Sequence, residues 1–273
     1  EEEWERYHGW LQEQKEWRQP PDEDVVIAGG EQINTRDVET LETSAWVRDN
    51  VLHYAFKELT PILGRADPLV AFFPSFFFTK LYQDGHKDPN QRDKYNYAGV
   101  ASWTKKILRA TPIDEMKTIV FLLNEGWMHW KCFAIFMDLK VIQAFDSGGS
   151  GGGQTLQDLY RWLHSMMEIQ DKTLKPVEWR LYCCRRDTPC QRDHDCGLYA
   201  IMFAMCVSKR LPLSLITRRR IEASKVILLC HLIGLQPERA GPLGAMNEFI
   251  PKRFRNPDTP SKELDSEAVL DLT

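Results

Sequence analysis

The eight residues from Leu198 to Met205 are apolar at every position. A helix of this composition has no polar face to turn towards water, so it has to be buried inside a folded domain. The chain has enough material for such a domain, because 273 residues with 43% hydrophobic content can bury one substantial core, or a core with a small lobe, without disulfides or metal. The sequence therefore predicts a globular fold with an enclosed helix over residues 196–210.

Charge and cysteine usage narrow the kinds of partner that the chain can have. The formal net charge is −4, which gives no electrostatic footprint for nucleic acid or an anionic membrane. No apolar run reaches the roughly 18 to 20 residues of a membrane span, and the first residues do not resemble a signal peptide. The seven cysteines are odd in number and irregularly spaced, which favours a reducing compartment, nucleus or cytoplasm.

The chain divides into three regions by composition. We expect residues 1–24 to form a charged N-terminal arm, residues 25–255 a single folded domain, and residues 256–273 a flexible C-terminal tail. The glycine-rich stretch at 147–153 lies between a strand and a helix, so it is predicted to be a loop inside the domain.

The order of the predicted elements indicates an α+β fold with strands in the middle of the chain. Thr43 and Ser44 are expected to cap a helix that ends at Pro61. Apolar and β-branched runs predict adjacent strands of one sheet, with a turn at residues 138–140. The predicted helices are 45–59, 155–167, 196–210 and 217–235, and the predicted strands are 118–123, 130–137, 141–145 and 177–184.

Three residues have the chemistry of a thiol peptidase, which needs a thiolate, an imidazole and a group that orients the imidazole. Cys196 opens the buried helix, where the helix dipole and free amides favour a thiolate. Gly197 follows it and would let a substrate backbone approach closely. His129 stands at the start of one predicted hairpin strand and Asp146 at the end of the other. The predicted turn lies close to midway between them, so the hairpin should return Asp146 to the level of His129.

Each residue alone also has an ordinary structural explanation. A cysteine at a helix start is more often a small buried hydrophobe, a histidine beside tryptophan more often packs, and an aspartate before Ser-Gly more often belongs to a turn. Zinc is an alternative because Cys183, Cys184, Cys190, His194 and Cys196 lie close together. Their spacing is poor for zinc, since adjacent cysteines on a strand point to opposite faces, and we expect no metal or other cofactor. Together the three residues favour catalysis.

The chain resembles the ubiquitin-like-protein-specific cysteine proteases, the SUMO-protease family, over about residues 33–235. The resemblance is carried by motifs that occur in the family's order, beginning with the helix that contains Trp46 and Asp49. The remaining motifs are Phe76-Phe77-Phe78-Thr79-Lys80-Leu81, Trp103-Thr104-Lys105-Lys106, His129-Trp130, Phe145-Asp146-Ser147 and Asp195-Cys196-Gly197.

The resemblance implies a papain-like cysteine protease fold of the ubiquitin-like-protease type, with a central mixed sheet flanked by helices. It implies a triad of Cys196, His129 and Asp146. It also implies that Trp46 and Trp130 line a tunnel for a Gly-Gly tail, while Asp49 meets a basic residue of the substrate. The expected protein is a monomer that cleaves after the terminal glycine of a modifier, with SUMO the first expectation, for precursor maturation or for release from lysine.

One departure from the family concerns the oxyanion-stabilising glutamine. The family places it six residues before the nucleophile, whereas Gln191 is five residues before Cys196 and Cys190 stands at the expected position. A loop shorter by one residue could still let the Gln191 amide donate to the oxyanion.

The alternatives to a SUMO protease are a deneddylase or deubiquitinase, an acetyltransferase on the same scaffold, and a modifier-binding module with weak catalysis.

Overall fold

The computed structural model describes residues 24–26, 32–42, 45–82, 95–108, 111–126, 128–149, 151–170, 178–184, 188–190 and 194–232. The predicted tail, all but the last residue of the predicted arm, and Gln191 lie outside these ranges. The predicted caps Thr43 and Ser44 lie outside them too. The limits of the three predicted regions therefore stay predictions.

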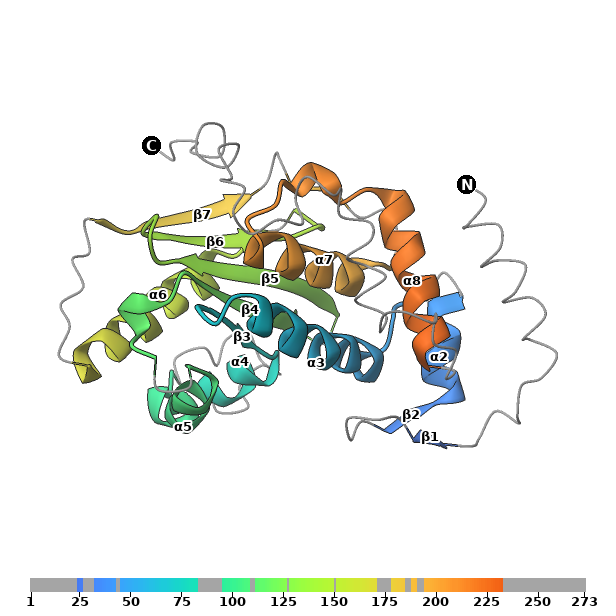
Figure 1. Ribbon diagram of the computed structural model, residues 1–273, viewed down its shortest axis with the longest axis horizontal. Coiled ribbons are helices and arrows are strands. Elements are labelled where there is room, and N and C mark those ends of the chain that lie inside the picture. The colour runs from blue at the N-terminus through green and yellow to red at the C-terminus, as the bar shows by residue number, and fades with distance from the viewer. Residues whose placement is uncertain are drawn as a thin grey trace.

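The described residues form a central sheet that lies between two groups of helices (Figure 1). The strands are β1 (Asp24–Val26), β2 (Gln32–Asn34), β3 (Val70–Phe73), β4 (Thr118–Glu125), β5 (His129–Phe136), β6 (Val141–Phe145) and β7 (Arg180–Cys184). The α-helices are α2 (Thr35–Glu42), α3 (Asp49–Ala66), α4 (Phe76–Leu81), α5 (Tyr97–Leu108), α6 (Gly153–Ile169), α7 (Cys196–Ser208) and α8 (Arg218–Leu232).

The central sheet is mixed and has the strand order β3-β4-β5-β6-β7. The three middle strands form an antiparallel meander, and the outer strands β3 and β7 run parallel to their neighbours. The predicted strands of the meander and the turn between β5 and β6 are confirmed. These strands were readable because they are apolar on both faces, as expected for strands covered on both sides.

Two hydrophobic clusters cover the two faces of the sheet. One joins α3, α7 and α8 to the face that carries Trp130, Cys132 and Ala134. The other joins α4, α5 and α6 to the face that carries Phe133 and Ile135. Alternate residues of β5 thus enter opposite cores, as strand geometry requires. The predicted α+β architecture, a central mixed sheet flanked by helices, is confirmed.

The predicted enclosed helix is α7, in which every residue from Cys196 to Ser208 is buried. It packs against β4 and β5 on one side and against α3 and α8 on the others. Gly197 makes the contact with α3 possible, because a Cβ added there would lie 2.2 Å from Cδ1 of Leu52. The helix that carries the candidate nucleophile is therefore fixed by packing on several sides.

Helix α3 differs from its prediction at both ends. It begins at Asp49, so Trp46 precedes the helix, and it continues through Pro61 to Ala66. The carboxylate of Asp49 suits the first turn because it interacts favourably with the helix dipole. A proline usually predicts the end of a helix, because it removes one backbone hydrogen bond. A helix can nevertheless continue past proline with a kink. Upstream, Asn34 caps the start of α2, since Asn34 and Asp37 each accept the other's backbone N–H, at 2.9 and 3.0 Å.

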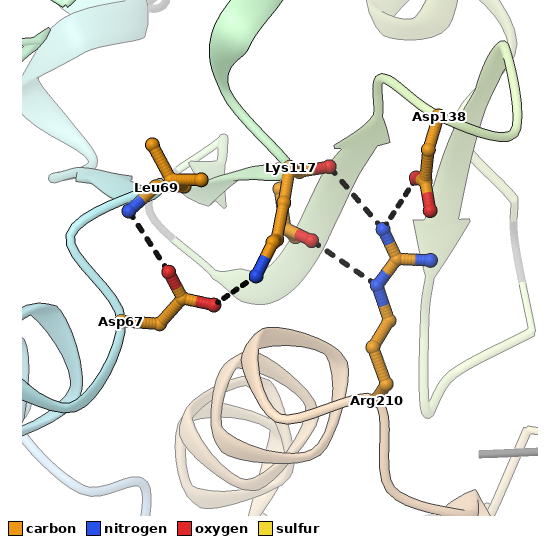
Figure 2. A network of polar contacts seen from close by, with 6 residues as sticks. Asp67, Leu69, Lys117, Asp138 and Arg210 are labelled. Carbon is orange, nitrogen blue, oxygen red and sulfur yellow. Dashed lines mark hydrogen bonds and ion pairs between the residues drawn. The ribbon is translucent and has the colours of Figure 1, made fainter. Parts of the chain in front are cut away.

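A network of polar contacts joins residues at the edge of the sheet where β4 begins and β5 ends (Figure 2). Arg210, just after α7, donates from Nη2 to Asp138 Oδ1 at 2.7 Å and to the Lys117 carbonyl at 3.2 Å. Its Nε donates to Thr118 Oγ1 at 3.2 Å, and its guanidinium lies over the Phe136 ring. One side chain thus joins the end of α7 to the β5–β6 turn and to the start of β4.

We expect Arg210→Ala to lower the free energy of unfolding by about 2 kcal/mol, because several hydrogen bonds to one charged group are lost together. Urea denaturation followed by circular dichroism measures the change. Arg218→Ala is the matched control, since it breaks an exposed ion pair with Glu222 within one helix. That control should cost less than about 0.5 kcal/mol. Equal losses in the two variants would show that the network adds nothing beyond an ordinary surface pair.

Candidate active site

The hairpin of β5 and β6 brings His129 and Asp146 into direct contact. Nε2 of His129 lies 2.6 Å from Oδ1 of Asp146, and the carboxylate is almost completely buried. The predicted register is wrong by two residues: Cys132 pairs with Phe145, so the next pair along would be Lys131, and not His129, with Asp146. His129 reaches the carboxylate diagonally from two residues further along the same strand face. The predicted contact exists although the two residues are not directly opposite.

Asp146 also shapes the loop that follows β6. Its Oδ1 accepts the backbone N–H of Gly148 at 2.8 Å, and its carbonyl accepts that of Gly149 at 3.2 Å. A Cβ at Gly148 would lie 2.9 Å from Cε1 of His129 and 3.3 Å from Oδ1 of Asp146. The Asp146 carboxylate therefore has both roles that the sequence suggested: it stabilises the turn after β6 and it contacts the imidazole of His129. Gly148 is required because the loop passes directly over the imidazole.

Cys196 meets the same imidazole from the N-terminus of α7. The hydrogen bonds of the ring with Asp146 and with Cys196 raise the pKa of His129 to about 9, although burial opposes the rise. Because Nε2 contacts the carboxylate, Nδ1 is the nitrogen left to exchange a proton with the thiol. The three predicted residues are thus brought together in the order thiol, imidazole, carboxylate, which is the arrangement that thiol acyl transfer needs.

The raised pKa predicts how His129 responds to pH. The ring should titrate near pH 9 in NMR spectra, and its stabilising effect should be complete below pH 6.5 and lost as the pH rises through 9. Asp146→Asn removes the largest cause of the shift, so the midpoint should then fall towards 6.5. A native midpoint close to 6.5 would contradict the contacts described above.

The four residues predicted to bind substrate lie around the junction of α3, α7 and the sheet. Trp46 is 52% exposed and meets His194 edge to face, whereas Trp130 is 5% exposed and meets His53. Of these two tryptophans, Trp46 is therefore the one whose side chain is largely accessible to solvent. Asp49 accepts two hydrogen bonds from the Asn124 side-chain amide, at 3.2 and 3.1 Å.

Gly197 has a packing role that the sequence did not suggest, because the direction of its missing side chain points at Leu52. Its predicted approach to substrate stays a prediction. Two further residues at the site were missed, Lys131 and Gly148. The signal for Lys131 was a lone charge inside the apolar strand Trp130-Lys131-Cys132-Phe133. Gly148 could not be distinguished from the other glycines of its loop.

A five-stranded mixed sheet, a buried helix that opens with cysteine and a His/Asp pair on the adjacent hairpin together define the class of papain-like cysteine proteases. The chain belongs to the Ulp1 protease family, because the model of that family's C-terminal catalytic domain matches residues 51–227. The resemblance noted from the sequence motifs is thereby confirmed.

Curated relatives are similar over more than two thirds of the chain. Sentrin-specific protease 2 of Mus musculus is 24% identical over 199 residues, which cover 71% of this chain and 31% of that protein. A sentrin-specific protease of Caenorhabditis elegans is 26% identical over 194 residues, covering 70% of this chain and 25% of that protein. The chain therefore spans a third or less of the length of these curated relatives.

Solved structures agree with the fold. The C-terminal Ulp1 protease domain in complex with Smt3, the yeast ortholog of SUMO, matches with a TM-score of 0.62 and 24% identity, covering 82% of this chain and 93% of that one. The Ulp1-like SUMO protease catalytic domain of Chaetomium thermophilum matches with a TM-score of 0.65 and 18% identity, covering 84% and 89%. These similarities establish the fold. The roles of individual residues are argued from the distances and contacts in this structure.

Proposed function

We propose that the chain is a cysteine peptidase domain that cleaves after the C-terminal Gly-Gly of a ubiquitin-like modifier, with SUMO as the modifier. The observation that carries the proposal is the contact of His129 with both Asp146 and Cys196 at the start of a buried helix. Membership of the Ulp1 protease family and the SUMO proteases among the similar proteins support the choice of modifier. Maturation of precursors and release from lysine use the same chemistry.

In the proposed reaction Cys196 attacks the carbonyl carbon of the terminal glycine, and its proton is held by His129. The imidazolium then gives that proton to the leaving amine, which departs and leaves a thioester. Water, deprotonated by His129, attacks the thioester and releases the modifier with a free carboxylate. Asp146 keeps the ring oriented and stabilises its charged form throughout.

The oxyanion of the tetrahedral intermediate needs donors close to the thiol. The backbone N–H groups at the start of α7 would be some of these donors, because the first amides of a helix have no partner within the helix. We assign the Gln191 side-chain amide as the further donor, by its place in the sequence. This assignment rests on the loop before α7 being one residue shorter than in the family.

The substrate tail would pass over the open face of Trp46 towards Cys196. An indole wall favours glycine there, since any larger side chain would have to displace the ring. Trp130 would form the opposite wall after a small movement, and Gly197 would let the tail approach the thiol. Asp49 is half-buried, and both of its carboxylate oxygens accept from Nδ2 of Asn124. Each oxygen has a second lone pair, with which the carboxylate would accept a basic residue of the modifier.

We further propose that the domain acts as a monomer, without a cofactor, in the nucleus or cytoplasm. The five cysteines whose side chains are described are all free thiols, as a reducing compartment would keep them. None of the helices in the described ranges is long and apolar enough to cross a lipid bilayer.

The test is a panel of modifier probes, each carrying an electrophile at the C-terminal glycine, offered to the native protein. We expect covalent labelling by the SUMO probe and at least about tenfold slower labelling by ubiquitin and NEDD8 probes. Preferential labelling by ubiquitin or NEDD8 would replace SUMO as the substrate. Failure of every modifier probe, with or without turnover of acetyl-coenzyme A, would overturn the proposal in favour of an acetyltransferase or a binding module.

A further inference from the structure

Lys131 is a buried cation inside the central sheet. Its side chain is 3% exposed although it lies on β5 between apolar neighbours. Its ammonium donates to the Gly151 carbonyl at 2.8 Å and lies 2.7 Å from Oε2 of Glu125 and 3.3 Å from Oδ2 of Asp146. An ammonium has three N–H donors, and here three acceptors surround it. Lys131 is therefore a fully partnered charge, held from three different segments of the chain.

The contact with Asp146 completes the surroundings of the proposed catalytic carboxylate. Oδ1 of Asp146 receives Nε2 of His129 and the N–H of Gly148, while Oδ2 faces Lys131. With partners on both oxygens the carboxylate cannot rotate about its Cβ–Cγ bond without breaking a charged contact. Oδ1 is thereby kept towards the imidazole.

The strand register makes the pairing of Lys131 with Asp146 a property of the backbone. Cys132 pairs with Phe145 as the last pair of the ladder, so the next position along would set Lys131 opposite Asp146, which directly follows β6. Directly opposed side chains lie close enough to interact without extending far. The contact is thus fixed by the hairpin and does not depend on a flexible chain finding its partner.

The charges around Lys131 also balance. Among the described residues, the charged and titratable groups that face it come from β4, as Glu125, from β5, as His129, and from the end of β6, as Asp146. A carboxylate that is 1% exposed is costly to bury without a cation beside it. Glu125 is 37% exposed and in turn offsets the charge of Lys131 on the side nearer to solvent.

We propose that Lys131 is a positioning residue for the proposed peptidase: it locks the Asp146 carboxylate so that His129 stays aligned with Cys196. Its part in the reaction rests on the proposed function, whereas its effect on His129 and on the thiol can be measured without any modifier. It touches neither substrate nor the reacting atoms, and acts only through Asp146.

The variant Lys131→Met keeps the length of the side chain and removes the charge. We expect kcat on a SUMO precursor to fall about 10²-fold with KM unchanged, the usual result of misplacing a catalytic group by about 1 Å. The bond to Asp146 is the largest cause of the raised pKa of His129, so loosening it should lower that pKa from about 9 towards 6.5. The alkaline limb of the pH profile should therefore move to lower pH.

The direction of that movement separates positioning from a simple effect of charge. Removing a nearby positive charge, with the geometry unchanged, would favour the imidazolium and move the alkaline limb to higher pH. A limb that moves up, or does not move at all in a folded variant, would overturn the proposal. Lys131→Arg restores the charge and should recover part of the lost kcat.

A readout without substrate keeps this test apart from the proposed function. The rate at which iodoacetamide alkylates Cys196 at pH 6.5 should fall about tenfold in Lys131→Met, because the imidazole that accepts the proton of the thiol is no longer held in line with the sulfur. In an Asp146→Asn background the same change should have no further effect, since Lys131 acts through that carboxylate. An equal loss in both backgrounds would contradict the proposal, even if no modifier proved to be a substrate.

The matched control is Lys117→Met, which removes a lysine directly before β4 from an ion pair with Asp67 at 3.1 Å. That pair is exposed and lies at the far end of β4 (Figure 2). The control should leave kcat and the alkylation rate within about twofold of the native values. Circular dichroism and thermal denaturation of each variant establish that the fold is retained.

Discussion

Cys196→Ala is expected to abolish cleavage of the modifier precursor, lowering kcat/KM by about 10⁴-fold or more, because no thioester can form without the sulfur. Removing the nucleophile leaves the imidazole, the carboxylate and the binding surface around Trp46 in place. The variant should therefore still bind the uncleaved precursor. Steady-state kinetics and a binding assay such as calorimetry measure the two effects separately.

Cys190→Ala is the control, because it removes an exposed free thiol six residues before Cys196. The electrophilic probe should label Cys190→Ala and fail to label Cys196→Ala. Labelling of both variants would show that the probe reacts elsewhere, and retained cleavage by Cys196→Ala would remove the thiol from the mechanism.

Gly197→Ala is expected to lower both stability and activity. The added Cβ would lie 2.2 Å from Cδ1 and 2.8 Å from Cδ2 of Leu52, which is itself 1% exposed and has little room to move. Overpacking of this kind costs about 1 to 3 kcal/mol. The same displacement reaches the neighbouring Cys196, so kcat should fall about 10²-fold. Denaturation curves and steady-state kinetics measure both losses.

Shortening Leu52 distinguishes the two roles of Gly197. Leu52→Ala alone should cost about 2 to 5 kcal/mol by leaving a cavity. Combined with Gly197→Ala it should cost less than the sum of the two single changes, and kcat should recover, because the methyl group fills part of that cavity. If stability recovers and kcat does not, the glycine is needed for the approach of substrate as well as for packing.

The meander and its site were predictable because local patterns fix them. The strands that become β4, β5 and β6 are apolar along most of their length and flank a turn, so their pairing follows from chain order. Contact between His129 and Asp146 tolerates an error of two residues in the register, because the side chains of a strand reach diagonal as well as opposite neighbours. The prediction of this contact therefore survived a register that was wrong.

The ends of the helices and the contacts of individual side chains were harder to predict from the sequence. The passage of α3 through Pro61 could not be read from local sequence, because proline disfavours a helix interior and usually predicts the end of a helix. The packing of Gly197 against Leu52 joins segments far apart in the sequence and leaves no local pattern. Lys131 did leave one, a charge within an apolar strand, but its partners Glu125 and Gly151 emerge only when the strands and the loop are placed.

The order of the three site residues along the chain has a consequence for folding. His129 and Asp146 belong to one hairpin and can meet by closing a short loop, whereas Cys196 joins them only when α7 docks between the sheet, α3 and α8. Until α7 docks, the sulfur is an ordinary thiol of a solvated chain. A chain in which α7 has not docked therefore lacks the imidazole and the carboxylate beside its sulfur, and a peptidase of this topology loses its nucleophile's partners as soon as that helix detaches.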